Sequence, residues 1–168
     1  MNRPPQRCAR ASVLYVEDHP VNVLLMSALL HHRPALELVI ATTGEQAMCI
    51  AANLRPTLLL LDLGLPDCHG SELLPLLRRL PGCEVVPAVA VTAEYDFEIE
   101  GSGFAELWPK PLDLQRVLQR MDTLIAAPTP SPSPLVGLPA EPACLEAAVA
   151  AAAAHASARQ RLPQMSSR

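Results

Sequence analysis

The chain has 168 residues, half of them hydrophobic but only five aromatic, so we expect one domain with an aliphatic core and room for a tail. Residues 1–126 carry fifteen acidic and ten basic side chains, a net charge of −5, which argues against nucleic acid as a partner. The five cysteines lack zinc-binding spacing and are expected to be reduced thiols. No secretory signal and no bilayer-spanning stretch is visible, so a cytoplasmic protein without a membrane partner is expected.

Short apolar runs alternate with helical patterns over most of the chain. The runs predicted to form strands are residues 12–16, 36–40, 58–61, 85–91 and 104–108. Helices are predicted after Pro20, after Thr43, after Gly70 and from Leu114, whereas the stretch from Glu94 to Gly101 is short and acidic. This alternation predicts an α/β fold: a doubly wound, five-stranded parallel sheet with helices on both faces.

Two helices carry finer local signals. Apolar residues of the first helix recur at helical spacing on one face, namely Val21, Leu24, Leu25, Ala28 and Leu29. In the third helix, Ser71 is placed to cap the N-terminus, and Pro75 falls within about the first turn, where its missing N–H costs little.

Composition also predicts where the domain begins and ends. Residues 1–11 are expected to be a flexible N-terminus and residues 12–126 the folded domain. Residues 127–168 begin with a Pro/Ser-rich stretch and continue into an Ala-rich one. We expect this tail to be mostly disordered, with one Ala-rich helix.

The stretch from Thr57 to Gly70, TLLLLDLGLPDCHG, organises the rest of the domain. Its four consecutive leucines read as a strand buried on both faces, and the run ends on the carboxylate of Asp62. An acid at the carboxyl end of such a strand lies where open α/β sheets bind ligands. Taken alone, Asp62 is better explained as a residue that merely opens a turn, so the polar residues at the other strand ends decide between the two interpretations.

Those strand ends carry further polar residues: Glu17 and Asp18 after the first strand, Thr92 after the fourth and Lys110 after the fifth. Parallel strands bring their carboxyl ends to one edge, so these side chains can converge with Asp62. Lys110 is the only lysine of the chain, as expected where the broad fork of arginine would not fit. Clustered carboxylates repel each other and need a cation, and an all-oxygen site suits Mg²⁺.

Four motifs, VEDHPVN, LLLLDLGLPDCHG, VTA and KP, resemble the receiver domain of two-component response regulators. The resemblance implies a flavodoxin-like fold with strand order 2-1-3-4-5. It also implies that Asp62 is the phosphoacceptor, that Glu17, Asp18, Asp62 and the Gly64 carbonyl bind Mg²⁺, and that Thr92 and Lys110 contact the phosphoryl group. A cis peptide bond between Lys110 and Pro111 is implied as well.

The function implied is that of a phosphoacceptor module rather than an enzyme acting on a separate substrate. A histidine kinase or a histidine phosphotransfer protein would donate the phosphoryl group, and no DNA-binding output domain is apparent. Two departures from the family bear on the output. The family has its fourth helix between the positions of Thr92 and Lys110, and the short spacing between these two residues predicts that this helix is shortened by about one turn. Leu107 stands where the family usually has an aromatic residue, and Trp108 should point to the opposite face.

Alternative functions remain open at this point. A scaffold that binds signalling partners without being phosphorylated is favoured by the shortened helix and opposed by the complete set of acids, threonine and lysine. An Mg²⁺-dependent hydrolase or a nucleotide-binding enzyme is disfavoured because no phosphate-binding glycine motif is present. His155 lacks the amphipathic surroundings of a phosphotransfer helix, and His19 and Cys68 are interpreted as bystanders.

Overall fold

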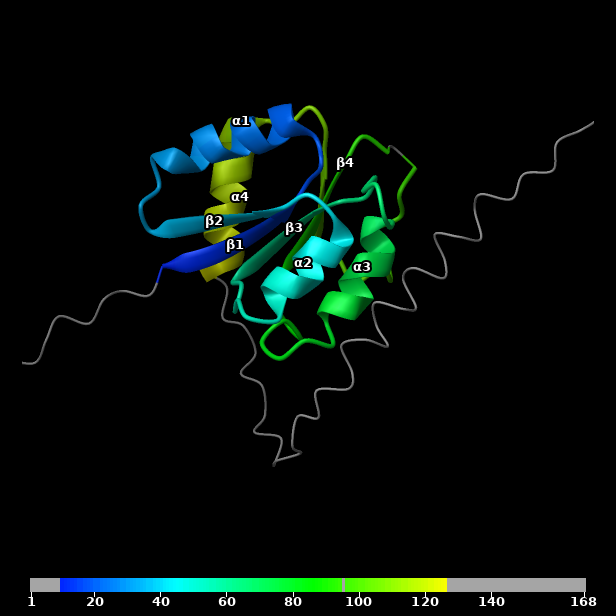
Figure 1. The fold of residues 1–168 in the computed structure, drawn as a ribbon. Coiled ribbons are helices and arrows are strands. Elements are labelled where there is room, and N and C mark those ends of the chain that lie inside the picture. The colour runs from blue at the N-terminus through cyan, green and yellow to red at the C-terminus, as the bar shows by residue number, and fades with distance from the viewer. Residues whose placement is uncertain (1–9, 95, 127–168) are drawn as a thin grey trace, which may run out of the picture. The chain divides into compact units, whose positions relative to one another are not determined.

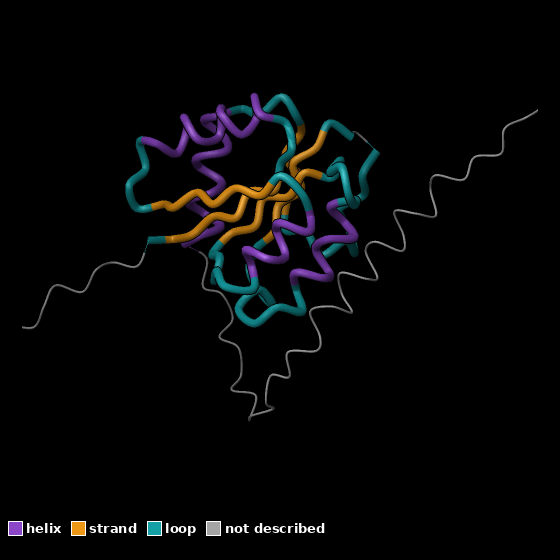
Figure 2. Tube along the Cα trace, in the orientation of Figure 1, coloured by secondary structure: helices purple, strands orange, loops and turns teal. Residues whose placement is uncertain are grey.

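A computed structural model describes residues 10–94 and 96–126, so the segments expected to be a flexible N-terminus and a disordered tail fall largely or wholly outside the described residues. The strands are β1 (Ala11–Val16), β2 (Leu36–Ala41), β3 (Leu58–Asp62), β4 (Ala88–Thr92) and β5 (Glu106–Pro109). The helices are α1 (Pro20–His31), α2 (Gly44–Ala51), α3 (Gly70–Leu77) and α4 (Leu114–Ala126). All neighbouring strands are parallel, in the order β2-β1-β3-β4-β5, which confirms the predicted fold (Figures 1 and 2).

Helices cover both faces of the sheet because the central strands are apolar on both sides. In β1, Val13 and Tyr15 contact the cluster formed with α1 and α4, whereas Leu14 and Val16 contact the cluster formed with α2 and α3. Every residue of β3 is buried. Figure 1 shows the same division, with α1 and α4 on one side of the sheet and α2 and α3 on the other. No helix in the described ranges is long and apolar enough to cross a membrane.

The strand boundaries differ from the predicted ones where proline or a turn intervenes. β4 begins at Ala88 rather than Val85, because Pro87 has no N–H to donate to the ladder. β5 begins at Glu106 rather than Phe104, whose ring is instead buried in the cluster on the α2 and α3 side.

The apolar face predicted for α1 is largely turned toward solvent. Val21 is 62% exposed and Leu24 69% exposed, whereas the residues that α1 buries are Met26 and Leu30. The helix is apolar on nearly every side, so its periodicity does not distinguish the core face from the outer face. The result is an exposed apolar strip on α1, which we define as Val21, Leu24 and Leu25.

The shortened helix expected between Thr92 and Lys110 is not formed, because residues 93–94 and 96–105 contain no helix at all. The segment instead runs as an irregular loop that turns at Gly101 and Gly103, both with positive φ. Glycine adopts this conformation without steric cost. Phe97, Ile99 and Phe104 provide the apolar contacts with the core that a helix would otherwise make.

The N-terminus of α3 is capped by His69 and not by Ser71. The His69 ring nitrogen Nδ1 accepts from the Ser71 N–H, and the Glu72 carboxylate accepts from the His69 N–H. Pro75 lies inside the helix, beyond the first turn. Gly70 is required for packing, since a Cβ there would collide with the backbone carbonyl oxygen of Asp62. This close approach holds α3 against the end of β3.

Candidate functional site

The polar residues predicted at the strand ends do come together at one edge of the sheet. Glu17 and Asp18 follow β1, Asp62 ends β3 and Thr92 ends β4, while Lys110 follows β5. Carboxylate oxygens of Glu17, Asp18 and Asp62 all lie within 4.8 Å of one another. The parallel register of β1 and β3 therefore places the three acids at one edge, and that of β3 and β4 brings Thr92 to the same edge, as the sequence predicts.

Glu17 is the most deeply buried of the acids, with no exposed surface. Its Oε1 accepts from the backbone N–H of His19 at 3.2 Å and from Nδ2 of Asn22 at 3.0 Å, and its Oε2 accepts from the Tyr15 hydroxyl at 3.0 Å. Burial alone would raise the pKa of Glu17, but the hydrogen bonds from Lys110 and Asn22 and the charge of Lys110 outweigh it and lower that pKa. Glu17 is therefore a carboxylate fixed in both charge and position.

Lys110 joins the two buried acids. Its Nζ lies 2.6 Å from Oδ2 of Asp62 and 2.8 Å from Oε2 of Glu17. Burial would lower the pKa of Lys110, but hydrogen bonds to the two carboxylates prevail and raise it, so the ammonium keeps its proton. The Lys110–Pro111 peptide bond is cis, which confirms the prediction.

Asp62 is oriented from two sides. Its Oδ2 accepts from Lys110, and its Oδ1 accepts from the backbone N–H of Gly64 at 3.1 Å. Each oxygen keeps a further lone pair, so the carboxylate can still ligate a cation or attack an electrophile. Gly64 lies directly beside the acid as a result, and it also forms an isolated bridge with His69.

The donor set of this cluster fits a hard divalent cation. Three carboxylates carry a charge of −3, and Lys110 offsets only one unit. Asp18 is exposed, so the cluster is open to solvent on one side, and all of its ligand atoms are oxygens. Mg²⁺ takes a few carboxylate oxygens and keeps several waters, which matches this arrangement.

Thr92 is nearly buried, at 2% exposure, and its hydroxyl oxygen accepts from the backbone N–H of Glu94 at 2.9 Å. Its carbonyl accepts from the Lys110 N–H at 2.8 Å. Within the described ranges, no hydrogen bond joins the Thr92 hydroxyl to Asp62. Among the described residues the Thr92 hydroxyl accepts one hydrogen bond and donates none, so its proton can be donated to a group bound between Thr92 and Asp62.

Two residues that orient Glu17 were not identified from the sequence. Tyr15 lies two residues before Glu17, and strand alternation places the two side chains on the same face, so a spacing signal existed. Asn22 is in the first turn of α1, five residues after Glu17, and nothing in the strand pattern indicates its contact. Burial next to Glu17 and Asp62 raises the pKa of the Tyr15 phenol, so it remains a hydrogen-bond donor to Glu17.

Asp67 holds the β3–α3 loop against another helix and was likewise not foreseen. Its carboxylate accepts from the backbone N–H groups of Gly44 and Glu45, both at 2.9 Å. It thereby caps α2 from outside that helix, together with Thr43, whose side chain accepts from the Gln46 N–H. Cys68 next to it has its pKa raised to about 12 by burial and by the charge of Asp67, so it stays a thiol.

Comparison with known proteins identifies the same architecture. The sequence profile described as the response regulator receiver domain matches residues 13–122. An uncharacterised 14.6 kDa protein of Leptolyngbya boryana is 32% identical over 112 residues, which cover 64% of this chain and 85% of that protein. The signal transduction histidine-protein kinase BarA of Escherichia coli K12 is 29% identical over 110 residues. That match covers 63% of this chain but only 12% of BarA.

Among solved structures, the receiver domain of the sensor histidine kinase PA1611 from Pseudomonas aeruginosa superimposes with a TM-score of 0.61 at 25% identity. The match covers 70% of this chain and 98% of that domain. The neighbour was crystallised with a magnesium ion coordinated in its active-site cleft.

Proposed function

This chain belongs to the response regulator receiver domain family, and we propose that it accepts a phosphoryl group on Asp62. The donor in this proposal is the phosphohistidine of a histidine kinase or of a histidine phosphotransfer protein. The observation that carries the assignment is the position of Asp62: it ends the central buried strand, beside two other acids and 2.6 Å from the Lys110 ammonium.

Transfer breaks the N–P bond of the phosphohistidine and forms an O–P bond to the Asp62 carboxylate, leaving the donor histidine as a free imidazole. Glu17, Asp18 and Asp62 hold Mg²⁺ in this proposal, with the Gly64 carbonyl as a further ligand. When bound, the ion supplies positive charge to the phosphoryl oxygens. Lys110 would add a second positive charge beside Asp62, where its ammonium already lies 2.6 Å from Oδ2.

Thr92 is the residue that reads the phosphoryl group. Its hydroxyl proton is free to donate to a phosphoryl oxygen on Asp62, and the hydroxyl oxygen is already bonded to the Glu94 N–H. A movement of Thr92 toward Asp62 therefore pulls on the loop formed by residues 93–105. That displacement is the conformational signal in this proposal.

The apolar strip on α1 is the surface that we propose for the phosphoryl donor. Val21 and Leu24 are exposed, and α1 begins directly after Asp18 and His19, so the strip borders the acidic cluster. A donor helix that packs on this strip brings its histidine to the rim of the site. An exposed apolar patch beside a reactive group is the expected form of such an interface.

The remaining parts of the proposal concern the whole protein. We propose a cytoplasmic signalling module that acts on no substrate other than the phosphoryl donor and does not bind nucleic acid or a membrane. Residues 12–126 form the receiver domain, and residues 127–168 are not needed for its folding. Limited proteolysis tests the boundary: it should remove the tail first and leave a body with an unchanged melting temperature.

A scaffold that is not phosphorylated is the second candidate. Two observations favour it: the absence of a helix in the described residues between β4 and β5, and Leu107 at the position of the usual aromatic residue. Such a scaffold would keep the fold and bind partners through its surface alone.

Incubation with acetyl phosphate and Mg²⁺, followed by intact-mass measurement, separates the two candidates. The phosphoacceptor gains one phosphoryl group, the Asp62→Asn variant gains none, and the control variant Asp96→Asn, at an exposed acid outside the cluster, behaves like the natural chain. An unmodified natural chain would favour the scaffold. A phosphoryl adduct that persists in Asp62→Asn would overturn the assignment of Asp62.

A further inference from the structure

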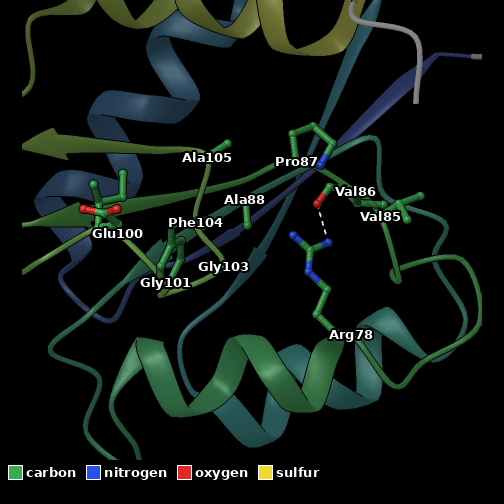
Figure 3. A pocket seen from close by; sticks show the side chains of 11 residues that line it. Arg78, Val85, Val86, Pro87, Ala88, Glu100, Gly101, Gly103, Phe104 and Ala105 are labelled. Atoms are coloured by element: carbon green, nitrogen blue, oxygen red, sulfur yellow. Dashed lines mark hydrogen bonds between the residues drawn. The ribbon is translucent and has the colours of Figure 1, made fainter. Parts of the chain in front are cut away.

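A hollow of about 770 Å³ lies at the end of β4 that is remote from the acidic cluster (Figure 3). β4 lines it with its first residue, Ala88, whereas its last residue, Thr92, belongs to the candidate phosphorylation site. The other walls come from the end of α3, from residues 85–87 and from residues 99–105. The hollow is therefore a separate site, bounded in part by the loop that occupies the place of the predicted helix.

The walls of the hollow are mainly apolar. Val85 is 43% exposed, and in the described ranges only Val21 and Leu24 are large hydrophobic residues with greater exposure. Ile99 and Phe104 line the hollow from the loop, and Gly101 and Gly103 contribute backbone without a side chain. An occupant with apolar side chains would remove Val85 from water and extend the contacts of Phe104.

Arg78 gives this apolar hollow a charge. Its Nη1 donates to the carbonyl oxygen of Cys83 at 2.8 Å and to that of Val86, which ties the end of α3 to the segment before β4. Figure 3 shows the guanidinium beside Val86 at the wall of the hollow. In the described ranges no carboxylate lies within ion-pair distance of Arg78, and its Nη2 and Nε have no protein partner.

Arg78 differs from the other arginines of the described ranges in being partly buried without a paired acid. Two further arginines in the described ranges are half-buried, and both pair with acids: Arg33 with Asp122 and Arg120 with Glu106. The remaining described arginines are exposed to water. Arg78 alone combines partial burial with the lack of an anion, and burial lowers the pKa of its guanidinium. A carboxylate bound beside the guanidinium would offset the free-energy cost of burying its charge.

The planar fork of arginine matches a carboxylate, which can accept from two of its nitrogens at once. Glu100 also borders the hollow, but it is exposed and lies at the end away from Arg78 in Figure 3. The charge at the Arg78 end is therefore positive and uncompensated.

We propose that this hollow binds a segment of a partner protein in which an aspartate or glutamate is flanked by apolar side chains. The carboxylate pairs with the free edge of the Arg78 guanidinium, and the flanking side chains cover Val85 and Phe104. The proposal does not depend on phosphorylation of Asp62, because the hollow lies at the other end of β4.

The probe is a set of short synthetic peptides with a central glutamate and varied apolar neighbours, each matched to a peptide with glutamine at the centre. Binding to the full chain is followed by fluorescence anisotropy, and the contact surface is mapped by amide chemical shifts. Glutamate peptides should bind about tenfold more tightly than their glutamine partners, since one charge-assisted pair is lost. The shifted amides should fall in residues 85–88 and 99–105.

Three variants locate the site. Arg78→Gln should remove the preference for glutamate, whereas Arg79→Gln, at the exposed neighbouring arginine outside the hollow, should retain it. Val85→Asp places a negative charge in the hollow without removing the Arg78 contacts, so it should weaken glutamate peptides even if Arg78→Gln fails to fold. Equal binding of glutamate and glutamine peptides, no binding by either, or shifted amides elsewhere would overturn the proposal.

Discussion

The acidic cluster at the carboxyl edge of the sheet and the loop formed by residues 93–105 are held in different ways. In the cluster, the buried acids take part in a short hydrogen-bond network: Glu17 receives four donors and Asp62 two. The loop is held by apolar contacts, chiefly those of Phe97, Ile99 and Phe104, by two glycine turns and by local hydrogen bonds around Ser102. The cluster is thus specified by strand ends, whereas the loop is specified by which side chains reach the core.

The largest expected effect tests the cluster without disturbing its fold. Asp18 is exposed, in contrast to Glu17 and Asp62, so Asp18→Ala should leave the melting temperature unchanged while removing a proposed metal ligand. We expect Mg²⁺-dependent phosphorylation by acetyl phosphate to be lost. If Asp18→Ala is phosphorylated as fast as the natural chain, or if a chelator does not change the rate of phosphorylation, the metal assignment is contradicted.

Removing the Lys110 ammonium from the hydrogen-bond network should lower the free energy of unfolding. Lys110→Met leaves the fully buried Glu17 carboxylate beside Asp62 without a neighbouring cation, at a cost of about 3 kcal/mol. In the natural chain the pKa of folded Glu17 is lowered, so its stabilising contribution is present above the unfolded pKa of glutamate and is lost as pH falls through the folded value.

In Lys110→Met, burial is no longer outweighed by Lys110, and we expect the pKa of Glu17 to rise. The variant should then gain stability as pH falls toward the unfolded pKa of glutamate, opposite to the natural chain. Urea unfolding at a series of pH values measures this difference. Parallel pH profiles would show that Lys110 does not govern Glu17.

The stability contributed by the loop should depend mainly on the ring of Phe104. Phe104 is buried in the cluster on the α2 and α3 side, so Phe104→Ala should cost about 3 kcal/mol by urea unfolding. Phosphorylation of Asp62 should persist, since Phe104 contacts none of the acids. The control Phe97→Leu keeps an apolar side chain at the partly buried neighbour and should cost less than Phe104→Ala. A loss of phosphorylation with retained stability would mean that the loop and the cluster are not separable.

The smallest effect concerns the coupling between the acidic cluster and the loop formed by residues 93–105. Trp108 packs on the α1 and α4 side and its Nε1 donates to Glu106, whereas Leu107 contacts the opposite cluster. The loop that Thr92 moves lies on the Leu107 side, so we expect phosphorylation to change Trp108 emission only slightly. A large change that Thr92→Ala removes would show that the signal crosses the sheet.

The features that could be predicted from the sequence are those set by local pattern. The run of leucines before Asp62, the acids after β1 and the lone lysine before proline each lie at a strand end, and parallel pairing is enough to bring them together. The order of the strands followed from family resemblance, and the fold confirms it.

The features that could not be predicted depend on tertiary contacts or on weak local signals. The spacing of apolar residues in α1 does not distinguish its outer face from its core face, because the helix is apolar on nearly all sides. His69 is an uncommon N-cap, so Ser71 was preferred. Asp67 caps α2 from more than twenty residues away in sequence, a contact that no local pattern records. The number of residues between Thr92 and Lys110 indicated a shortened helix, but not its replacement by a loop.

Chemical mapping of the modified residue decides whether Asp62 carries the phosphoryl group. The protein is phosphorylated with acetyl phosphate and Mg²⁺, reduced with borohydride so that an acyl phosphate becomes an alcohol, digested and sequenced by tandem mass spectrometry. We expect reduction at Asp62 alone, with Asp18 and Asp67 unmodified. Reduction at another carboxylate, or none in a protein that has gained a phosphoryl group, would contradict it.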